Sequence, residues 1–325
     1  MSITKPLVSI CCITYNHENY IRDAIEGFLM QKTTFPLEII IHDDASTDGT
    51  AKIIRYYAEQ NPDTIKPILQ TTNQFSTGTK PLAQIVFPLA KGKYIAICEG
   101  DDYWTDPQKL QKQVDFMEEN PECSMCFHSV NEIDATSKKI VSLHRNSNKS
   151  RYFTIEELIL GGGGLVGTQS IVFKKSIINE LPDFYNISPA GDYPLVLLAS
   201  TKGGVYYIER VMASYRVNNP HSTMGVVREI QFEKKMERYG RFAQMLYEFN
   251  NYSSGHFETA IKQKASQLVF TTYRRFRLSV DMKSRISEFM KWRKYLSFKH
   301  QIFSSLLIFP IPATWNQLKA LKNGG

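Results

Sequence analysis

The chain has 325 residues, of which 42% are hydrophobic and 22% are charged, and this ordinary globular composition excludes a fibrous or wholly disordered protein. Its net charge of +7 is uneven, because residues 228–325 hold 18 Lys and Arg against 7 Asp and Glu, whereas residues 1–227 hold 21 against 25. Basic charge without a recognition motif is weak support for nucleic-acid binding, so we expect no nucleic-acid partner. The apolar run at residues 7–13 is too short for a secretory signal, and we expect a cytoplasmic protein.

Strand and helix patterns alternate through the first 130 residues. The predicted strands are 7–14, 37–42, 65–70, 94–98 and 124–128, and the predicted helices begin near residues 21, 50, 81 and 107. Pro67 lacks a backbone N–H, so the third strand belongs at an edge of the sheet. This alternation predicts an α/β protein with a Rossmann-like, mainly parallel sheet flanked by helices.

The next hundred residues have a mixed pattern. Residues 131–153 are polar and basic without a clear period, and we expect a long surface loop there. Beyond them the sequence predicts a short helix from residue 154, a strand at 170–173, a helix near 175–181, and two short strands at 205–208 and 213–217. We expect this part to shape a substrate site on the sheet.

Three motif-like patterns do not meet the requirements of the sites that they resemble. The C-x-x-C at residues 123–126 lacks the second ligand pair of a zinc site, and we expect all five cysteines to be reduced. The G-x-G-x-x-G at residues 162–167 is followed by a predicted strand, whereas a dinucleotide site needs a helix there. A calcium loop that began at Asp44 would need Glu where Arg55 stands.

Polar groups collect where three predicted strands end. They are TYN at residues 14–16, HDDASTDGT at 42–50 and EGDD at 99–102, and ligands of open parallel sheets bind at this edge. Glu99, Asp101 and Asp102 would repel one another, so a cation, a ligand or wide exposure to solvent must separate their charges. A solvated acidic turn remains the alternative to a functional site.

Three segments together carry a family resemblance. They are VSICCITYNHENYIRDAIEGFLMQ, LEIIIHDDASTDGT and KGKYIAICEGDDYWTDPQKLQKQVDFM. In this order and spacing they resemble the inverting family 2 glycosyltransferases of GT-A fold, over roughly residues 6–220. The resemblance implies a hexosyltransferase-type enzyme that takes a nucleotide-diphosphate sugar, with UDP-sugars favoured, and needs Mn²⁺ or Mg²⁺. A glycan or lipid-linked acceptor in bacterial surface-polysaccharide assembly is usual for similar chains, and no motif of the polymer-forming members is present.

The resemblance also assigns roles to the acidic segments. Asp102 is the expected metal ligand, and Asp101 is expected at the metal or the ribose. Glu99 stands where the family often has Asp, so its role stays open. Asp44 matches the family's aspartate that accepts a hydrogen bond from the base, and a carboxylate suits the N3–H of uracil or thymine and, less specifically, the N1–H of guanine. Thr14, Tyr15 and Asn16 would then lie beside that base.

Asp192 stands where the family places its catalytic base, which would take the proton of the acceptor hydroxyl. The family usually has an acidic pair there, whereas here Gly191 precedes Asp192. Two alternatives stay open, namely that Asp192 is a plain helix cap and that the chain is a non-catalytic nucleotide-sugar or glycan-binding module. In the later segment YRVNNPHS, Asn218 occupies the commoner histidine position, and His221 is the expected assisting metal ligand.

The sequence predicts two parts. Residues 1–227 would form the GT-A domain, with a nucleotide-sugar-binding half at 1–130 and an acceptor half at 131–227, and residues 228–325 a basic helical region. Within residues 270–325, Lys and Arg alternate with apolar residues, a composition typical of helices that lie on a membrane surface. Packing on the catalytic domain or on a second copy in a homo-oligomer is the alternative. The apolar run 302–315 is too short to span a bilayer.

Overall fold

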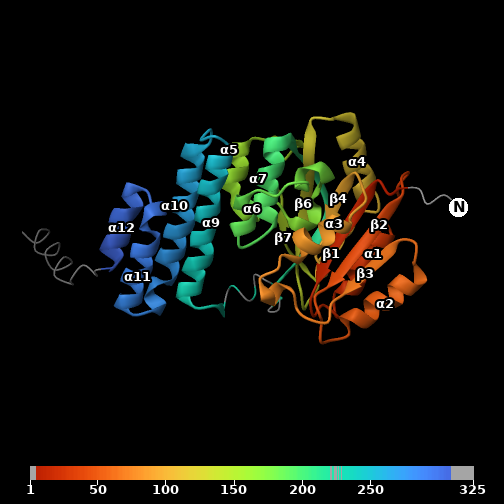
Figure 1. Cartoon of the computed structure of the whole chain (residues 1–325), viewed down its shortest axis with the longest axis horizontal. Coiled ribbons are helices and arrows are strands. Elements are labelled where there is room, and N and C mark those ends of the chain that lie inside the picture. The colour runs from red at the N-terminus through yellow and green to blue at the C-terminus, as the bar shows by residue number, and fades with distance from the viewer. Residues whose placement is uncertain (1–4, 220–221, 223–224, 226, 228, 309–325) are drawn as a thin grey trace, which may run out of the picture. The chain divides into compact units, whose positions relative to one another are not determined.

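The computed structural model describes residues 5–219, 222, 225, 227 and 229–308, and Figure 1 shows its elements. The chain divides into two compact units. The first, called here the sheet unit, comprises Met1–Asn186 and Ala190–Arg228, and the second, the helical unit, comprises Ile187–Pro189 and Glu229–Gly325.

The sheet unit is built on one ten-stranded sheet with the order β3-β2-β1-β4-β9-β6-β10-β5, from which β7 pairs with β6 and β8 with β10. The strands are β1 (Val8–Thr14), β2 (Leu37–Asp43), β3 (Ile65–Leu69), β4 (Tyr94–Ile97), β5 (Tyr103–Trp104), β6 (Cys123–Asp134), β7 (Ile140–His144), β8 (Arg151–Phe153), β9 (Val172–Lys174) and β10 (Gly204–Val217). β1, β2, β3 and β4 pair in parallel, as do β6 and β10, whereas β9 is antiparallel to both β4 and β6. The expected α/β architecture is confirmed.

Two expectations about the second half of this unit are wrong. The segment expected as a loop contains the last part of β6, then β7 and β8. β7 is exposed along most of its length and is held by backbone pairing with β6. It therefore lacks the alternation of apolar and polar residues by which a half-buried strand is recognised in a sequence. The two short strands expected at 205–208 and 213–217 are one strand, β10, which has register shifts at Ile208/Val211 and Val211/Ala213.

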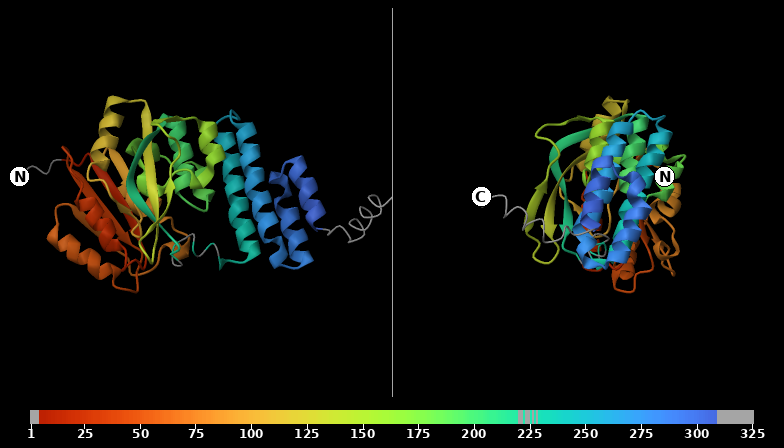
Figure 2. Two further views of the ribbon diagram at one scale, coloured as in Figure 1. Left: turned by 180° about the vertical axis from the view of Figure 1, so that it is seen from behind. Right: turned by 90° about the vertical axis from the view of Figure 1, so that its left-hand side faces the viewer.

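The helices of the sheet unit cover its sheet (Figures 1 and 2). They are α1 (Ile21–Leu29), α2 (Thr50–Gln60), α3 (Phe87–Leu89), α4 (Lys109–Glu119), α5 (Ile155–Gly161), α6 (Asp183–Ile187) and α7 (Asp192–Lys202). The expected helix at 81–90 begins as a π-helical turn, Leu82–Val86, before α3. The expected helix near 175–181 is a single 3₁₀ turn, Lys175–Ile178.

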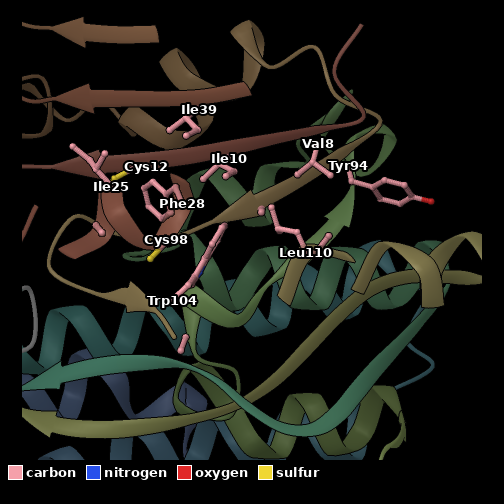
Figure 3. Packing of buried hydrophobic residues seen from close by; sticks show 14 of the residues in the cluster. Val8, Ile10, Cys12, Ile25, Phe28, Ile39, Tyr94, Cys98, Trp104 and Leu110 are labelled. Atoms are coloured by element: carbon pink, nitrogen blue, oxygen red, sulfur yellow. The ribbon is translucent and has the colours of Figure 1, made fainter. Parts of the chain in front are cut away.

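Apolar side chains of β1, β2, β4, α1 and α4 form one core (Figure 3). α1 forms because its buried residues recur at helical spacing, and it presents Phe28 to Trp104, whose ring centroid lies 4.9 Å from that of Phe28. Gly27 permits this approach, since a Cβ there would lie 3.0 Å from the backbone nitrogen of Trp104. The core therefore fixes β5, which directly follows the acidic EGDD segment.

The helical unit contains α9 (Phe232–Tyr252), α10 (Glu258–Phe276), α11 (Met282–Trp292) and α12 (Phe298–Ile308). α9 packs against α10 and α11, and α12 packs against α10 and α11. Gly240 lets α9 approach α11 closely, because a Cβ there would lie 2.3 Å from Cε3 of Trp292. Among the described residues, no helix is both long enough and apolar enough to cross a membrane. The last part of the apolar run 302–315 lies outside the described residues.

Candidate active site at the strand ends of the sheet unit

The parallel register brings the three polar segments to one edge of the sheet. Thr14 pairs with Asp43 at the end of β1 and β2. The amide of Asp44 donates to the carbonyl of Thr14 at 2.9 Å, and the amide of Gly100 donates to the carbonyl of Ile13 at 2.9 Å. The segments 14–16, 42–50 and 99–102 are therefore held together by backbone hydrogen bonds.

Gly100 makes room for the end of β1. A Cβ at Gly100 would lie 2.6 Å from Oγ1 of Thr14 and 3.0 Å from Cδ1 of Ile21, which a larger residue could not meet without displacing β1 or α1. Oγ1 of Thr14 is buried and has no hydrogen-bond partner among the described residues. The glycine of EGDD is thus required by close packing at the site.

Asp101 and Asp102 are both buried, and Asp102 accepts a hydrogen bond from the amide of Arg216 at 2.8 Å. Burial and the charge of Asp101 raise the pKa of Asp102 well above its usual range. Burial, Asp101 and then Asp192 raise the pKa of Glu99 to about 8. These carboxyls crowd together at high electrostatic cost, which a bound cation would relieve.

A divalent cation fits this donor set. Mg²⁺ and Mn²⁺ prefer oxygen ligands and are often held by one or two carboxylates together with substrate phosphates. Within the part of the chain that the structure describes, no group of three or more His, Cys, Asp and Glu side chains could hold a metal ion alone. Asp101 and Asp102 would thus hold a cation only together with ligands from a phosphate group or water.

Arg216, on β10, is the main site residue that the sequence reasoning missed. It is only 2% exposed, and its guanidinium donates to the carbonyl of Asp101 and to the carboxylate of Asp23. It also lies over the rings of Tyr20 and Tyr103, 4.9 and 4.7 Å from their centroids. A lone Arg within an otherwise apolar predicted strand was the available signal.

Two further side chains reach Asp101. Nε2 of His17 lies 3.9 Å from Oδ2 of Asp101, and burial lowers the pKa of His17 although Asp101 opposes this shift. The side-chain nitrogen Nδ2 of Asn219 lies 3.5 Å from the same oxygen of Asp101. The side chain of Asn218 instead donates to the carboxylate of Asp134 at 2.9 Å. Asn219, rather than Asn218, is therefore the asparagine near the acidic motif. His221, the expected metal ligand, lies outside the described residues.

The segment expected beside the base has an unusual backbone. Asn16 and Ala45 both have left-handed φ angles, 54° and 62°, which are uncommon for residues other than glycine. Asn16 accepts a hydrogen bond from the amide of Thr47 at 2.8 Å, while Tyr15 is 44% exposed. The carboxylate of Asp44 accepts from the amides of residues 74 and 75, at 2.7 and 3.0 Å. Asp44 thus orders the loop after β3.

Asp192 is the first residue of α7, where the helix dipole favours an anion. Its carboxylate accepts from the amide of Tyr193 at 2.8 Å and lies 3.5 Å from Oγ1 of Thr168. The residues that line a pocket with Asp192 are Leu158, Gly162, Gly163, Leu165, Val166, Tyr193 and Val196. The charge of Asp192 also contributes to the raised pKa of Glu99. Asp192 therefore lies in the neighbourhood of the acidic motif, although it follows that motif by about ninety positions in the sequence.

A buried polar network connects these two parts of the site. The indole of Trp104 donates to the carbonyl of Gln169 at 2.9 Å, and the side chain of Gln113 donates to the carbonyl of Ser170 at 2.9 Å. Lys109 donates to Gln113 at 2.8 Å and lies 4.1 Å from the ring centroid of Trp104. These bonds fix the turn Thr168–Ser170 to β5, the strand that follows Asp102, and to α4. The same turn contains Thr168, whose hydroxyl lies near Asp192. Sequence reasoning did not find this network.

The amino-acid sequence is similar to a protein family and to several bacterial proteins. Residues 9–181 match the model of glycosyl transferase family 2. The uncharacterized protein Rv1520 of Mycobacterium tuberculosis is 39% identical over 210 residues, which cover 64% of this chain and 58% of that protein. Escherichia coli WfaP, a UDP-Glc:alpha-D-GlcNAc-diphosphoundecaprenol beta-1,3-glucosyltransferase, is 38% identical over 112 residues, 34% of this chain and 41% of WfaP.

Two solved structures share the fold. Staphylococcus aureus TarS 1-349 in complex with UDP-GlcNAc has a TM-score of 0.66 and 16% identity, covering 90% of this chain and 82% of that one. The mannosyltransferase PcManGT of Pyrobaculum calidifontis, in complex with GDP-Man and Mn²⁺, has a TM-score of 0.51 and 15% identity, covering 97% and 88%. Since the family model spans more than half of the sequence, the chain belongs to glycosyl transferase family 2.

Proposed function

We propose that the chain is a metal-dependent inverting glycosyltransferase that moves one sugar from a nucleotide-diphosphate sugar to a glycan or lipid-linked acceptor. The observation that carries this proposal is the buried pair Asp101 and Asp102 at the strand ends, with Asp192 contacted by Thr168 of the turn to which Trp104 is hydrogen-bonded. A cationic centre and a separate carboxylate are the two parts that inverting transfer needs.

Asp101 and Asp102 would hold Mg²⁺ or Mn²⁺ against the diphosphate of the donor. The ion, when bound, stabilises the negative charge that develops on the leaving nucleoside diphosphate. Arg216 positions both aspartates, through its amide to Asp102 and its guanidinium to the carbonyl of Asp101. The guanidinium is itself held by its ion pair with the carboxylate of Asp23.

Asp192 would act as the general base. Its carboxylate would accept the proton of the acceptor hydroxyl while that oxygen attacks the anomeric carbon from the face opposite the diphosphate, which inverts the configuration. The Tyr193 amide and Thr168 orient this carboxylate. Gly162 and Gly163 line the same pocket as Asp192.

The donor is proposed to be a UDP-sugar. The loop after β3 that Asp44 orders, together with Tyr15, would receive the base, and the carboxylate of Asp44 would accept the N3–H of uracil. TarS was solved with UDP-GlcNAc and WfaP is named for UDP-Glc, which supports uridine. The name of WfaP also supports a lipid-linked acceptor.

One panel tests this proposal. UDP-, GDP- and dTDP-sugars are each incubated with the chain, with Mn²⁺ or with EDTA, and both thermal stabilisation and release of the nucleoside diphosphate are measured. The proposal expects stabilisation and release with a UDP-sugar that both require Mn²⁺. Stabilisation without any release, even with added acceptor glycans, would instead indicate a binding module. Equal release in EDTA would contradict the role of the metal.

A further inference from the structure

α11 carries a row of apolar side chains on its solvent side. Met282, Ile286 and Met290 follow one another at intervals of four residues, which places them on one face of the helix, and all three are exposed, Met290 by 50%. The opposite face of α11 is buried through Glu288 and Trp292. The helix therefore carries an apolar row on its exposed side, whereas its buried side holds Trp292 and Glu288.

α12 continues this exposed apolar surface. Phe298 is 79% exposed and Ile302, one helical turn later, is 46% exposed. α11 packs on α9, α12 packs on α10, and α11 and α12 contact each other, so the two helices are neighbours in the helical unit (Figures 1 and 2). We call the exposed apolar residues of these two helices the outer face. They are Met282, Ile286, Met290, Phe298 and Ile302.

Uncompensated positive charge surrounds the outer face. Residues 270–308 contain nine Lys and Arg but only two acidic residues. Asp281 caps α11 by accepting from the amide of Ser284 at 3.0 Å, and the buried Glu288 accepts from the indole of Trp292 at 2.9 Å. Among the described residues, Lys283, Lys291 and Lys299 take part in no ion pair, unlike Lys262 of α10, which pairs with Glu258. Both acidic groups are thus used inside the helical unit.

We propose that the outer face docks onto the surface of a lipid bilayer that contains anionic lipids. Exposed aliphatic and aromatic side chains would enter the interface between headgroups and acyl chains, and the surrounding Lys and Arg would attract the anionic headgroups. A second copy of the chain fits less well, because an isologous contact would bring two such basic surfaces together. Nucleic acid would engage the basic groups but leave the row of Met and Ile in water. The inference does not depend on the proposed function.

The test uses the full chain and extruded vesicles. One set contains only phosphatidylcholine and another contains 30% phosphatidylglycerol, and the protein bound after flotation is measured at about 50 mM and about 500 mM salt. We expect binding to the anionic vesicles at low salt, at least tenfold less binding to the neutral ones, and a loss of at least tenfold at high salt because exposed charges are screened.

Two variants and two matched controls assign the binding to the outer face. Ile286→Asp, and the pair Lys283→Glu with Lys291→Glu, should each lower the bound fraction at least tenfold. Leu89→Asp changes an exposed apolar residue of the sheet unit, and Lys52→Glu with Arg55→Glu reverses the same number of charges on α2, and neither should change binding. All six positions are exposed, and a thermal melt verifies that each variant is folded.

Four results would overturn the proposal. The first is absence of the full chain from the anionic vesicles at low salt. The second is equal loss of binding in the variants and in the controls, because the charge of the whole chain would then suffice. The third is a shift of solution mass from dimer to monomer in Ile286→Asp without a change in vesicle binding, which would assign the outer face to a second copy. Competition by a short RNA that Lys283→Glu with Lys291→Glu abolishes, while Ile286→Asp does not, would likewise assign the surface to nucleic acid.

Discussion

The sheet unit and the helical unit place their charges differently. In the sheet unit, Asp101, Asp102 and Arg216 are buried at the strand ends and bonded to one another, at an electrostatic cost that the pKa shifts record. In α11 and α12 of the helical unit, Lys283, Lys291 and Lys299 lie at the surface near exposed apolar residues, and Asp281 and Glu288 cap or brace α11. Buried, mutually repelling charges suggest a site for one small ligand, whereas exposed charges of one sign suggest an extended surface.

The largest effect is expected from a substitution in the buried acidic pair. Asp102→Asn keeps the shape of the side chain but removes the proposed metal ligand, so metal-stimulated transfer should become undetectable while the thermal melt shows a folded protein. Asp63→Asn, an exposed aspartate before β3, is the matched control and should keep full activity. Full activity in Asp102→Asn would mean that this carboxylate serves only the fold.

The second substitution concerns the proposed base. Asp192→Asn should lower transfer by roughly 10²- to 10⁴-fold, which is the usual contribution of general acid–base catalysis, with little change in donor affinity. Asp183→Asn, at the start of α6, changes another aspartate at a helix start and should have little effect. Equal loss of donor binding and of turnover in Asp192→Asn would assign Asp192 to donor binding or to structure.

The buried Lys109 allows a test through pH. Burial lowers its pKa to about 7, so between pH 7 and its unfolded pKa of about 10.4 the unfolded chain binds a proton that the folded chain does not. The free energy of unfolding should therefore rise over this range by about 1.4 kcal/mol per pH unit from this group. In Lys109→Met this contribution is absent, and the variant should lose about 2–3 kcal/mol relative to the parent between pH 7 and pH 9. Denaturant titrations of both proteins measure the difference, and parallel pH profiles would contradict it.

The smallest effect is expected at Gly100. Gly100→Ala brings a Cβ against Thr14 and should destabilise the sheet unit by about 1–3 kcal/mol, the usual cost of overpacking. Thr14→Ala removes Oγ1, the nearest atom that this Cβ would meet, but leaves the Cβ of residue 14 at 2.7 Å, so the double variant should recover only part of the loss. Additive effects of the two changes would show that the contact between these residues does not limit the packing.

The sequence predicted most of the sheet unit because its signals are local. β1, β2 and β4 are short apolar runs, α1 has a clear helical period, and Pro67 correctly places β3 at the edge. β7 was missed because backbone pairing, rather than buried side chains, holds an exposed strand. The division of β10 into two strands was wrong because register shifts interrupt its alternation.

The candidate site was less predictable than the fold. The acidic motif and the turn at Asp44 follow strands directly, so their convergence could be expected from parallel pairing. Arg216 and the turn Thr168–Ser170, which Trp104 and Gln113 contact, come from distant parts of the chain, and only tertiary packing brings them to the acidic motif. The exposed row on α11 also needed the structure, because a helical period does not tell which of two apolar faces is buried.

The central claim is that Asp101 and Asp102 bind a divalent cation together with the diphosphate of a donor. The most direct measurement is the binding of UDP by calorimetry, to the parent and to Asp102→Asn, in Mn²⁺ and in EDTA. We predict that the parent binds UDP at least tenfold more tightly in Mn²⁺ than in EDTA, and that Asp102→Asn loses this difference while Asp63→Asn retains it. Equal affinity of the parent for UDP in Mn²⁺ and in EDTA would contradict the account.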